Sequence, residues 1–114
     1  MQLLVFILND VDNVGTILKE FVNNDIPGTT VLDCHGSLET MAHSNVEPPS
    51  LFGSFRTFLS SGYEMGKMLI TVLPHEKMEK AKQVIRDVVG DLSKPNTGIM
   101  FTISLDSVEG LAKH

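Results

Sequence analysis

The feature that most constrains the fold is an uninterrupted apolar run near the start of the sequence, Leu3-Leu4-Val5-Phe6-Ile7-Leu8. Six apolar residues closed by Asn9-Asp10 are too few to span a bilayer and short for a helix, so the run predicts a β-strand. Because successive strand side chains point to opposite faces, a strand that is apolar throughout requires cover on both faces of its sheet. Met68–Leu73 repeats this signal, with Thr71 as its one polar residue.

Helical and strand patterns alternate around these two runs. Asn9 or Asp10 can cap a helix whose apolar stripe has helical spacing, and Asp25-Ile26-Pro27-Gly28 ends that helix. A β-branched segment, 29–35, predicts the second strand, and Gly36 stops it. The first stripe consists of Val14, Ile17, Leu18, Phe21 and Val22.

The second half of the sequence repeats the plan of the first. Residues 67–73 predict a strand, Pro74-His75-Glu76 opens a helix, and 99–105 alternate as a final strand. The inner face of the second helix is expected to comprise Met78, Ala81, Val84, Ile85, Val88 and Val89. One face of the last strand is expected to carry Ile99, Phe101, Ile103 and Leu105.

The order β-α-β-β-α-β predicts an α+β fold, a ferredoxin-like sandwich with a four-stranded antiparallel sheet and both helices on one face. Strands 3–8 and 67–73 are then central, which agrees with their continuous apolar character. The second face of the sheet has no helix to cover it. Because exposing an apolar face to water is unfavourable by about 25 cal/mol per Å², we expect other copies of the chain to cover it.

Length and composition limit the classes of protein to which this sequence can belong. A sequence of 114 residues predicts one domain, and a net charge of −5 with no basic run argues against a nucleic-acid partner. The single cysteine, Cys34, excludes an intramolecular disulfide and any multi-cysteine zinc motif. With no signal-peptide pattern and no apolar run of membrane-spanning length, we expect a cytoplasmic protein without direct membrane insertion.

A long insertion, 37–66, separates the two halves, and loops of this length in compact domains are usually functional. Its first part is polar and ends in Glu47-Pro48-Pro49. Ser50 could then cap a short helix, which would either dock on its own assembly or enter a groove of a partner protein. The residues expected to contact a partner are Leu51, Phe52, Phe55, Arg56 and Phe58, with Leu59 on the same apolar stripe.

Three short segments give the sequence a family resemblance: Gly28-Thr29-Thr30-Val31, Gly36 at the end of the second strand, and Gly98-Ile99-Met100-Phe101. With the order of elements over residues 1–36 and 67–106, they resemble the PII signalling family and its PII-like relatives. The resemblance implies a non-enzymatic homotrimer with its sheets turned inward and small ligands, most often adenine nucleotides, in clefts between subunits. Residues 37–66 correspond to the T-loop, which would regulate a target protein such as a transporter or an enzyme.

The same resemblance implies a set of ligand-binding residues. Thr30 matches a threonine near the adenine, and Gly36 a glycine at the base of the T-loop. Where the family continues with Gly-Arg-Gln, this chain has Ser37-Leu38-Glu39, so Ser37 and Leu38 are expected at the ligand while Glu39 disfavours phosphate. Lys94 and Gly98 fall in the phosphate-facing loop. We therefore expect a nucleotide with fewer phosphates than ATP, or another small anion or metabolite as effector.

Two alternatives remain open. Asp33 and His35 share a face of the second strand, and with His43 they could bind a divalent metal, as in the related trimeric CutA family. Ferredoxin-like chains also form dimeric barrels that act as small enzymes. The sequence contains no Ser-His-Asp spacing, P-loop or paired-acid motif, so we expect no catalytic residues and no enzymatic activity.

Overall fold

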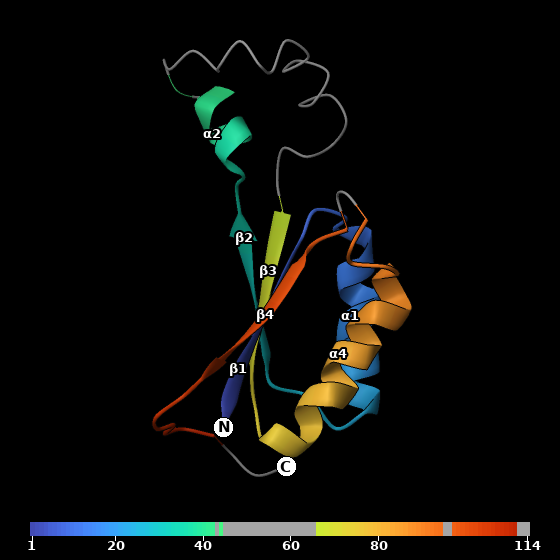
Figure 1. The fold of residues 1–114 in the computed structure, drawn as a ribbon, viewed down its shortest axis with the longest axis vertical. Coiled ribbons are helices and arrows are strands. Elements are labelled where there is room, and N and C mark those ends of the chain that lie inside the picture. The colour runs from blue at the N-terminus through green and yellow to red at the C-terminus, as the bar shows by residue number, and fades with distance from the viewer. Residues whose placement is uncertain (43, 45–65, 95–96, 112–114) are drawn as a thin grey trace.

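The structure is a computed structural model, and it describes residues 1–42, 44, 66–94 and 97–111. In chain order the described elements are β1 (Gln2–Leu8), α1 (Asp12–Asn23), β2 (Thr29–Cys34), α2 (Ser37–Ala42), β3 (Gly66–Leu73), α4 (His75–Val89) and β4 (Ile99–Ser104). All strand pairs are antiparallel, in the order β2-β3-β1-β4, and α1 and α4 lie on the same side of the sheet (Figure 1). The ferredoxin-like α+β fold is confirmed, and the two continuously apolar strands are the central ones.

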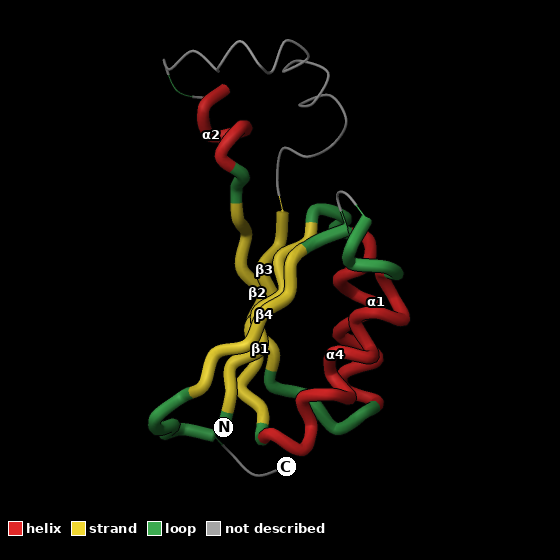
Figure 2. Tube along the Cα trace, in the orientation of Figure 1, coloured by secondary structure: helices red, strands yellow, loops and turns green. Residues whose placement is uncertain are grey.

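The hydrophobic core lies between the sheet and the two helices (Figure 2). In β1, Leu4, Phe6 and Leu8 are at most 1% exposed, and their strand partners Leu69 and Thr71 are also buried. Thr71 is accommodated there because its hydroxyl donates a hydrogen bond of 3.1 Å to the backbone oxygen of Gly28. The helices contribute Ile17, Phe21, Met78, Ala81, Val84 and Ile85.

The helix patterns predicted these contacts with one error. Ile17 and Phe21 are buried as expected, and Asp10 Oδ1 accepts a hydrogen bond from the free backbone N–H of Asp12 at the start of α1. Val22, which we assigned to the apolar stripe, is 60% exposed. It follows Phe21 by one residue, which turns it about 100° around the helix axis and away from the core.

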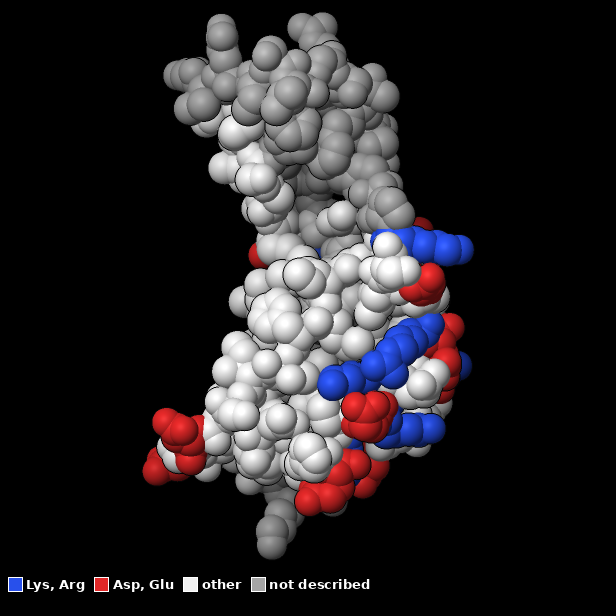
Figure 3. Space-filling view, viewed as in Figure 1, with Lys and Arg blue, Asp and Glu red and all other residues white. Residues whose placement is uncertain are grey.

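The opposite face of the sheet carries no helix, and we call it the bare face. Strand register places on it Leu3, Val5 and Ile7 from β1, Met68, Ile70 and Val72 from β3, Thr30 and Leu32 from β2, and Ile99, Phe101 and Ile103 from β4. Leu32, Ile99, Phe101 and Ile103 are between 41% and 57% exposed. Charged side chains gather instead over the helices, and the sheet side is largely free of them (Figure 3).

β2 leads away from the sheet into α2, and β3 begins beside the end of β2 (Figure 1). Gly66 begins β3 opposite Cys34, and a Cβ atom there would lie 2.9 Å from the backbone oxygen of Leu8 and 3.3 Å from the Cys34 sulfur. The close approach of β3 to the backbone of β1 at this point therefore requires glycine. Among the described residues, no helix has the length and apolar character to cross a membrane.

Candidate functional site

Thr30 lies on β2 at an edge of the sheet, opposite Ile70 on β3. Its side chain is exposed on the bare face, where it carries the only hydroxyl among the strand residues that the register places there. A hydroxyl can both donate and accept a hydrogen bond. Thr30 thus supplies a directional polar group at the margin of an apolar surface, which suits its expected role in ligand binding.

Gly36 lies two residues after Cys34, the last residue of β2, and immediately before α2. Its backbone oxygen accepts hydrogen bonds from the backbone N–H of Thr40 at 3.0 Å and from the Thr40 hydroxyl at 2.9 Å. These bonds form the first turn of α2, in which Ser37 and Leu38 are the first two residues. The insertion, which we described only as polar at its start, therefore begins as a short helix.

Lys94 and Gly98 belong to the connection between α4 and β4. Lys94 lies in a turn closed by a 3.2 Å hydrogen bond from its backbone N–H to the oxygen of Asp91. The Ser93 hydroxyl and backbone N–H both donate to the Asp91 carboxylate and hold the pKa of that carboxyl below its usual range. Gly98 has a φ of 135°, and a Cβ atom there would lie 2.6 Å from the backbone oxygen of Ile7. Only glycine fits this position without strain.

The strand order separates the expected ligand residues. Thr30 and Gly36 belong to the β2 edge of the sheet, whereas Gly98 immediately precedes β4 at the opposite edge. β3 and β1 lie between these two edges. Within one chain the structure therefore does not gather these residues around one point of the sheet, and their role in ligand binding stays a prediction.

An ion pair joins β2 and β3 next to the insertion at 37–66. The Lys67 ammonium donates a hydrogen bond to the Asp33 carboxylate directly across the β2-β3 pair. This hydrogen bond, the charge of Lys67 and, to a smaller extent, His35 hold the pKa of Asp33 below its usual range. Asp33 is thereby engaged by a cation, and within the described residues no three His, Cys, Asp or Glu side chains cluster closely enough to hold a metal ion. His43, the third expected ligand, lies outside those residues.

A Lys67→Met variant is expected to raise the pKa of Asp33 back toward its usual range. Because the pair favours the charged carboxylate in the folded state, its contribution to stability is present above the unfolded-state pKa and is lost as pH falls through the lower folded-state pKa. A carboxyl-detected NMR titration of Asp33 measures this directly. Lys82→Met, which removes the 3.6 Å pair with Glu79 on α4, is the control and should leave Asp33 unchanged.

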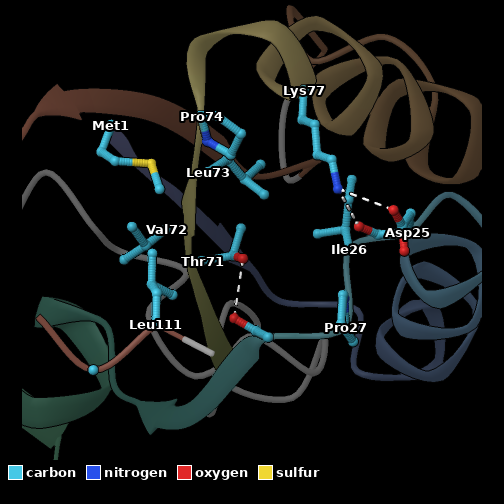
Figure 4. Close-up of a pocket in the computed structure, with 12 residues that line it drawn as sticks. Met1, Asp25, Ile26, Pro27, Thr71, Val72, Leu73, Pro74, Lys77 and Leu111 are labelled. Carbon is cyan, nitrogen blue, oxygen red and sulfur yellow. Dashed lines mark hydrogen bonds and ion pairs between the residues drawn. The ribbon is translucent and has the colours of Figure 1, made fainter. Parts of the chain in front are cut away.

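Sequence reasoning missed a pocket of about 660 Å³ at the other end of β3 (Figure 4). Its walls come from the α1–β2 connection, the end of β3, the start of α4 and both terminal segments. The signal present in the sequence was Pro27-Gly28, which we interpreted as the end of a helix and, for Gly28, as part of the family resemblance, but not as the wall of a pocket. The lining residues are Met1, Asp25, Ile26, Pro27, Gly28, Thr71, Val72, Leu73, Pro74, Lys77, Gly110 and Leu111.

The residues expected to bind a partner lie outside the described residues, so their role stays a prediction. They are Leu51, Phe52, Phe55, Arg56 and Phe58.

Comparison of the chain with protein-family models and with curated proteins found no match to either.

Proposed function

We propose that the chain is a non-enzymatic, PII-like regulator that works as a homotrimer. Copies of the chain cover the bare face, a small ligand binds where two copies meet, and the insertion at 37–66 contacts a target protein such as a transporter or an enzyme. The ligand is an adenine nucleotide or another small anionic metabolite. The single observation that carries this proposal is the apolar, helix-free side of the sheet.

The bare face has the apolar residue composition of a protein interior. Both central strands present only apolar side chains there, and the β4 edge adds Ile99, Phe101 and Ile103. Soluble monomers rarely leave a contiguous apolar surface of this kind in water, whereas the centre of an interface between subunits has this character. Identical copies are the economical source of a matching apolar surface.

The separation of the ligand residues also favours binding between copies. Thr30 and Gly36 lie at one edge of the sheet and Gly98 at the other. When several sheets pack together through their bare faces, an edge of one sheet can approach a different edge of the next. Residues that one chain keeps apart would then line a common cleft, which is the arrangement that the resemblance to PII-like proteins implies.

The regulatory step would use the direct connection between the ligand and the insertion. Thr30 and Gly36 are joined by β2, and the Asp33–Lys67 pair ties the two strands at the base of the insertion. A ligand changes the arrangement of the insertion only if it binds one arrangement more tightly than another. Hydrogen bonds from the ligand to groups at Gly36 and Ser37 would provide this difference.

Native mass spectrometry of the protein taken directly from cells tests the assembly and the ligand together. We expect a mass of three chains, with AMP or ADP retained or binding on addition more tightly than ATP. Hydrogen exchange should then show increased protection within 37–66 when the ligand is present. A monomer at micromolar concentration, or unchanged exchange across a broad metabolite panel, would contradict the proposal.

A Thr30→Val variant tests the site without changing side-chain shape. We expect ligand affinity to fall by roughly tenfold, because a hydrogen bond to a polar or charged ligand group is lost. Isothermal titration calorimetry measures the change. Thr102→Val, on β4 and on the opposite face of the sheet, is the matched control and should bind as the wild type does.

A further inference from the structure

The pocket at the end of β3 exists because β2 begins late. The β2-β3 pairing starts at Thr29 and Thr71, so β2 supplies no partner for Val72 and Leu73. Asp25, with a φ of 65°, and the following Pro27-Gly28 carry the chain across from α1 before it joins the sheet. The space that a longer β2 would fill remains open between this connection and the start of α4 (Figure 4).

The walls of this pocket are mostly apolar. Ile26 and Pro27 line it from the α1–β2 connection, Val72 and Leu73 from β3, and Met1 and Leu111 from the terminal segments. Its volume of about 660 Å³ falls within the range of small-molecule sites in proteins. The hydroxyl of Thr71 is already used by Gly28, so it adds little polarity. The walls favour an apolar ligand body.

The charged side chains that line the pocket are Lys77 and Asp25, and they contact each other. The Lys77 ammonium donates to the Asp25 backbone oxygen at 2.8 Å and to its carboxylate at 3.3 Å (Figure 4). An ammonium has three N–H donors, so one remains for a ligand. The Asp25 side chain is 76% exposed and can turn toward water when another anion takes its place. α4 begins without a side-chain cap and carries Glu76 in its first turn, so Lys77 rather than the helix terminus supplies the positive charge at the pocket.

We propose that this pocket is a second ligand site and that it binds a small amphiphilic carboxylate. The apolar tail lies against Ile26, Val72 and Leu111, and the carboxylate accepts a hydrogen bond from Lys77. The site is separate from the cleft proposed above, because it lies where β3 ends at Leu73, whereas Gly36 lies beyond Cys34, which pairs with the first residue of β3. All of its lining residues belong to one chain, and Val72 among them also lies on the bare face.

Octanoate and octanol are suitable probes, since they share a tail length and differ in charge. In an isotope-labelled sample of the full chain, octanoate should bind saturably with a dissociation constant of about 1 mM and shift the amide signals of Gly28, Val72 and Lys77. Lys77→Met should weaken octanoate about tenfold and leave octanol unchanged. Lys82→Met, on the same helix, is the matched charge control and should have no effect.

A Gly28→Leu variant fills the pocket instead of changing its charge. A Cβ atom at this position meets no atom within 4 Å, and Gly28 is not among the residues with positive φ, so the substitution is expected to fold. It should abolish binding of both probes. Octanoate shifts confined to Phe101 and Ile103 on the bare face, or equal weakening of both probes by Lys77→Met, would overturn the proposal. Equal weakening of both probes by Lys77→Met does not bear on the number of chains or on nucleotide binding, so this proposal can fail while the proposed function stands.

Discussion

A Phe101→Lys, Ile103→Lys double variant is expected to be a folded monomer at concentrations at which the proposed trimer of the wild type would form. Both side chains lie on the bare face and are 41% and 47% exposed in the single chain, so the core does not depend on them. Burying an unpaired ammonium between copies costs several kcal/mol. The dissociation constant should therefore rise at least about 1000-fold, which sedimentation velocity over a range of concentrations measures.

Val22→Lys is the matched control for this experiment. Val22 is likewise an exposed apolar residue, with a fractional exposure of 60%. It lies on α1, on the other side of the sheet. The variant should assemble as the wild type does. If the double variant keeps the wild-type mass while circular dichroism shows an intact fold, assembly does not use the bare face and the proposed function loses its main support.

Gly98→Ala is expected to have the largest effect on stability. An alanine at a φ of 135° is strained, and its Cβ would lie 2.6 Å from the backbone oxygen of Ile7 and 2.7 Å from the ring of Phe6. The Phe6 ring is fully buried and the Ile7 oxygen belongs to a central strand, so neither can move away easily. Backbone strain and overpacking together should reduce the free energy of unfolding by roughly 3–5 kcal/mol, measured by urea unfolding at one fixed protein concentration.

Gly15→Ala makes the same chemical change with the opposite expected sign. Gly15 lies inside α1, and a Cβ atom there meets no atom within 4 Å. Alanine should raise the free energy of unfolding by about 0.5–1 kcal/mol, because it reduces the freedom of the unfolded chain and favours helix. A Gly98→Ala protein as stable as the wild type would show that the loop before β4 does not approach β1 as closely as described.

Apolar periodicity was sufficient to predict the fold. Leu3–Leu8 and Met68–Leu73 identified the two central strands because apolar residues fall on both faces of each, with Thr71 as the one polar residue. The buried stripe of α4 followed from helical spacing alone. The error at Val22 has a simple cause: spacing shows which residues can share a face, but the width of that face depends on how the helix lies on the sheet.

The candidate site was less predictable, because it depends on contacts between distant segments. Gly98 was singled out through the resemblance to PII-like proteins, yet its close approach to Ile7 required the strand order. The Asp33–Lys67 pair required the register of β2 on β3. The pocket at the end of β3 combines residues from five separate segments, including both terminal ones, and no local pattern indicates that they meet.

The central place of β1 has a consequence for biosynthesis. Its two neighbours in the sheet are β3 and β4, both of which follow it at long range in the chain. Translation proceeds at about 5–20 residues per second, so for several seconds the most apolar segment of the nascent protein has no strand to pair with. α1 is synthesised immediately afterwards, and its Ile17 and Phe21 pack in the same core as Leu4 and Phe6 of β1. We therefore expect α1 to be the first element that can bury apolar side chains of β1 on the ribosome.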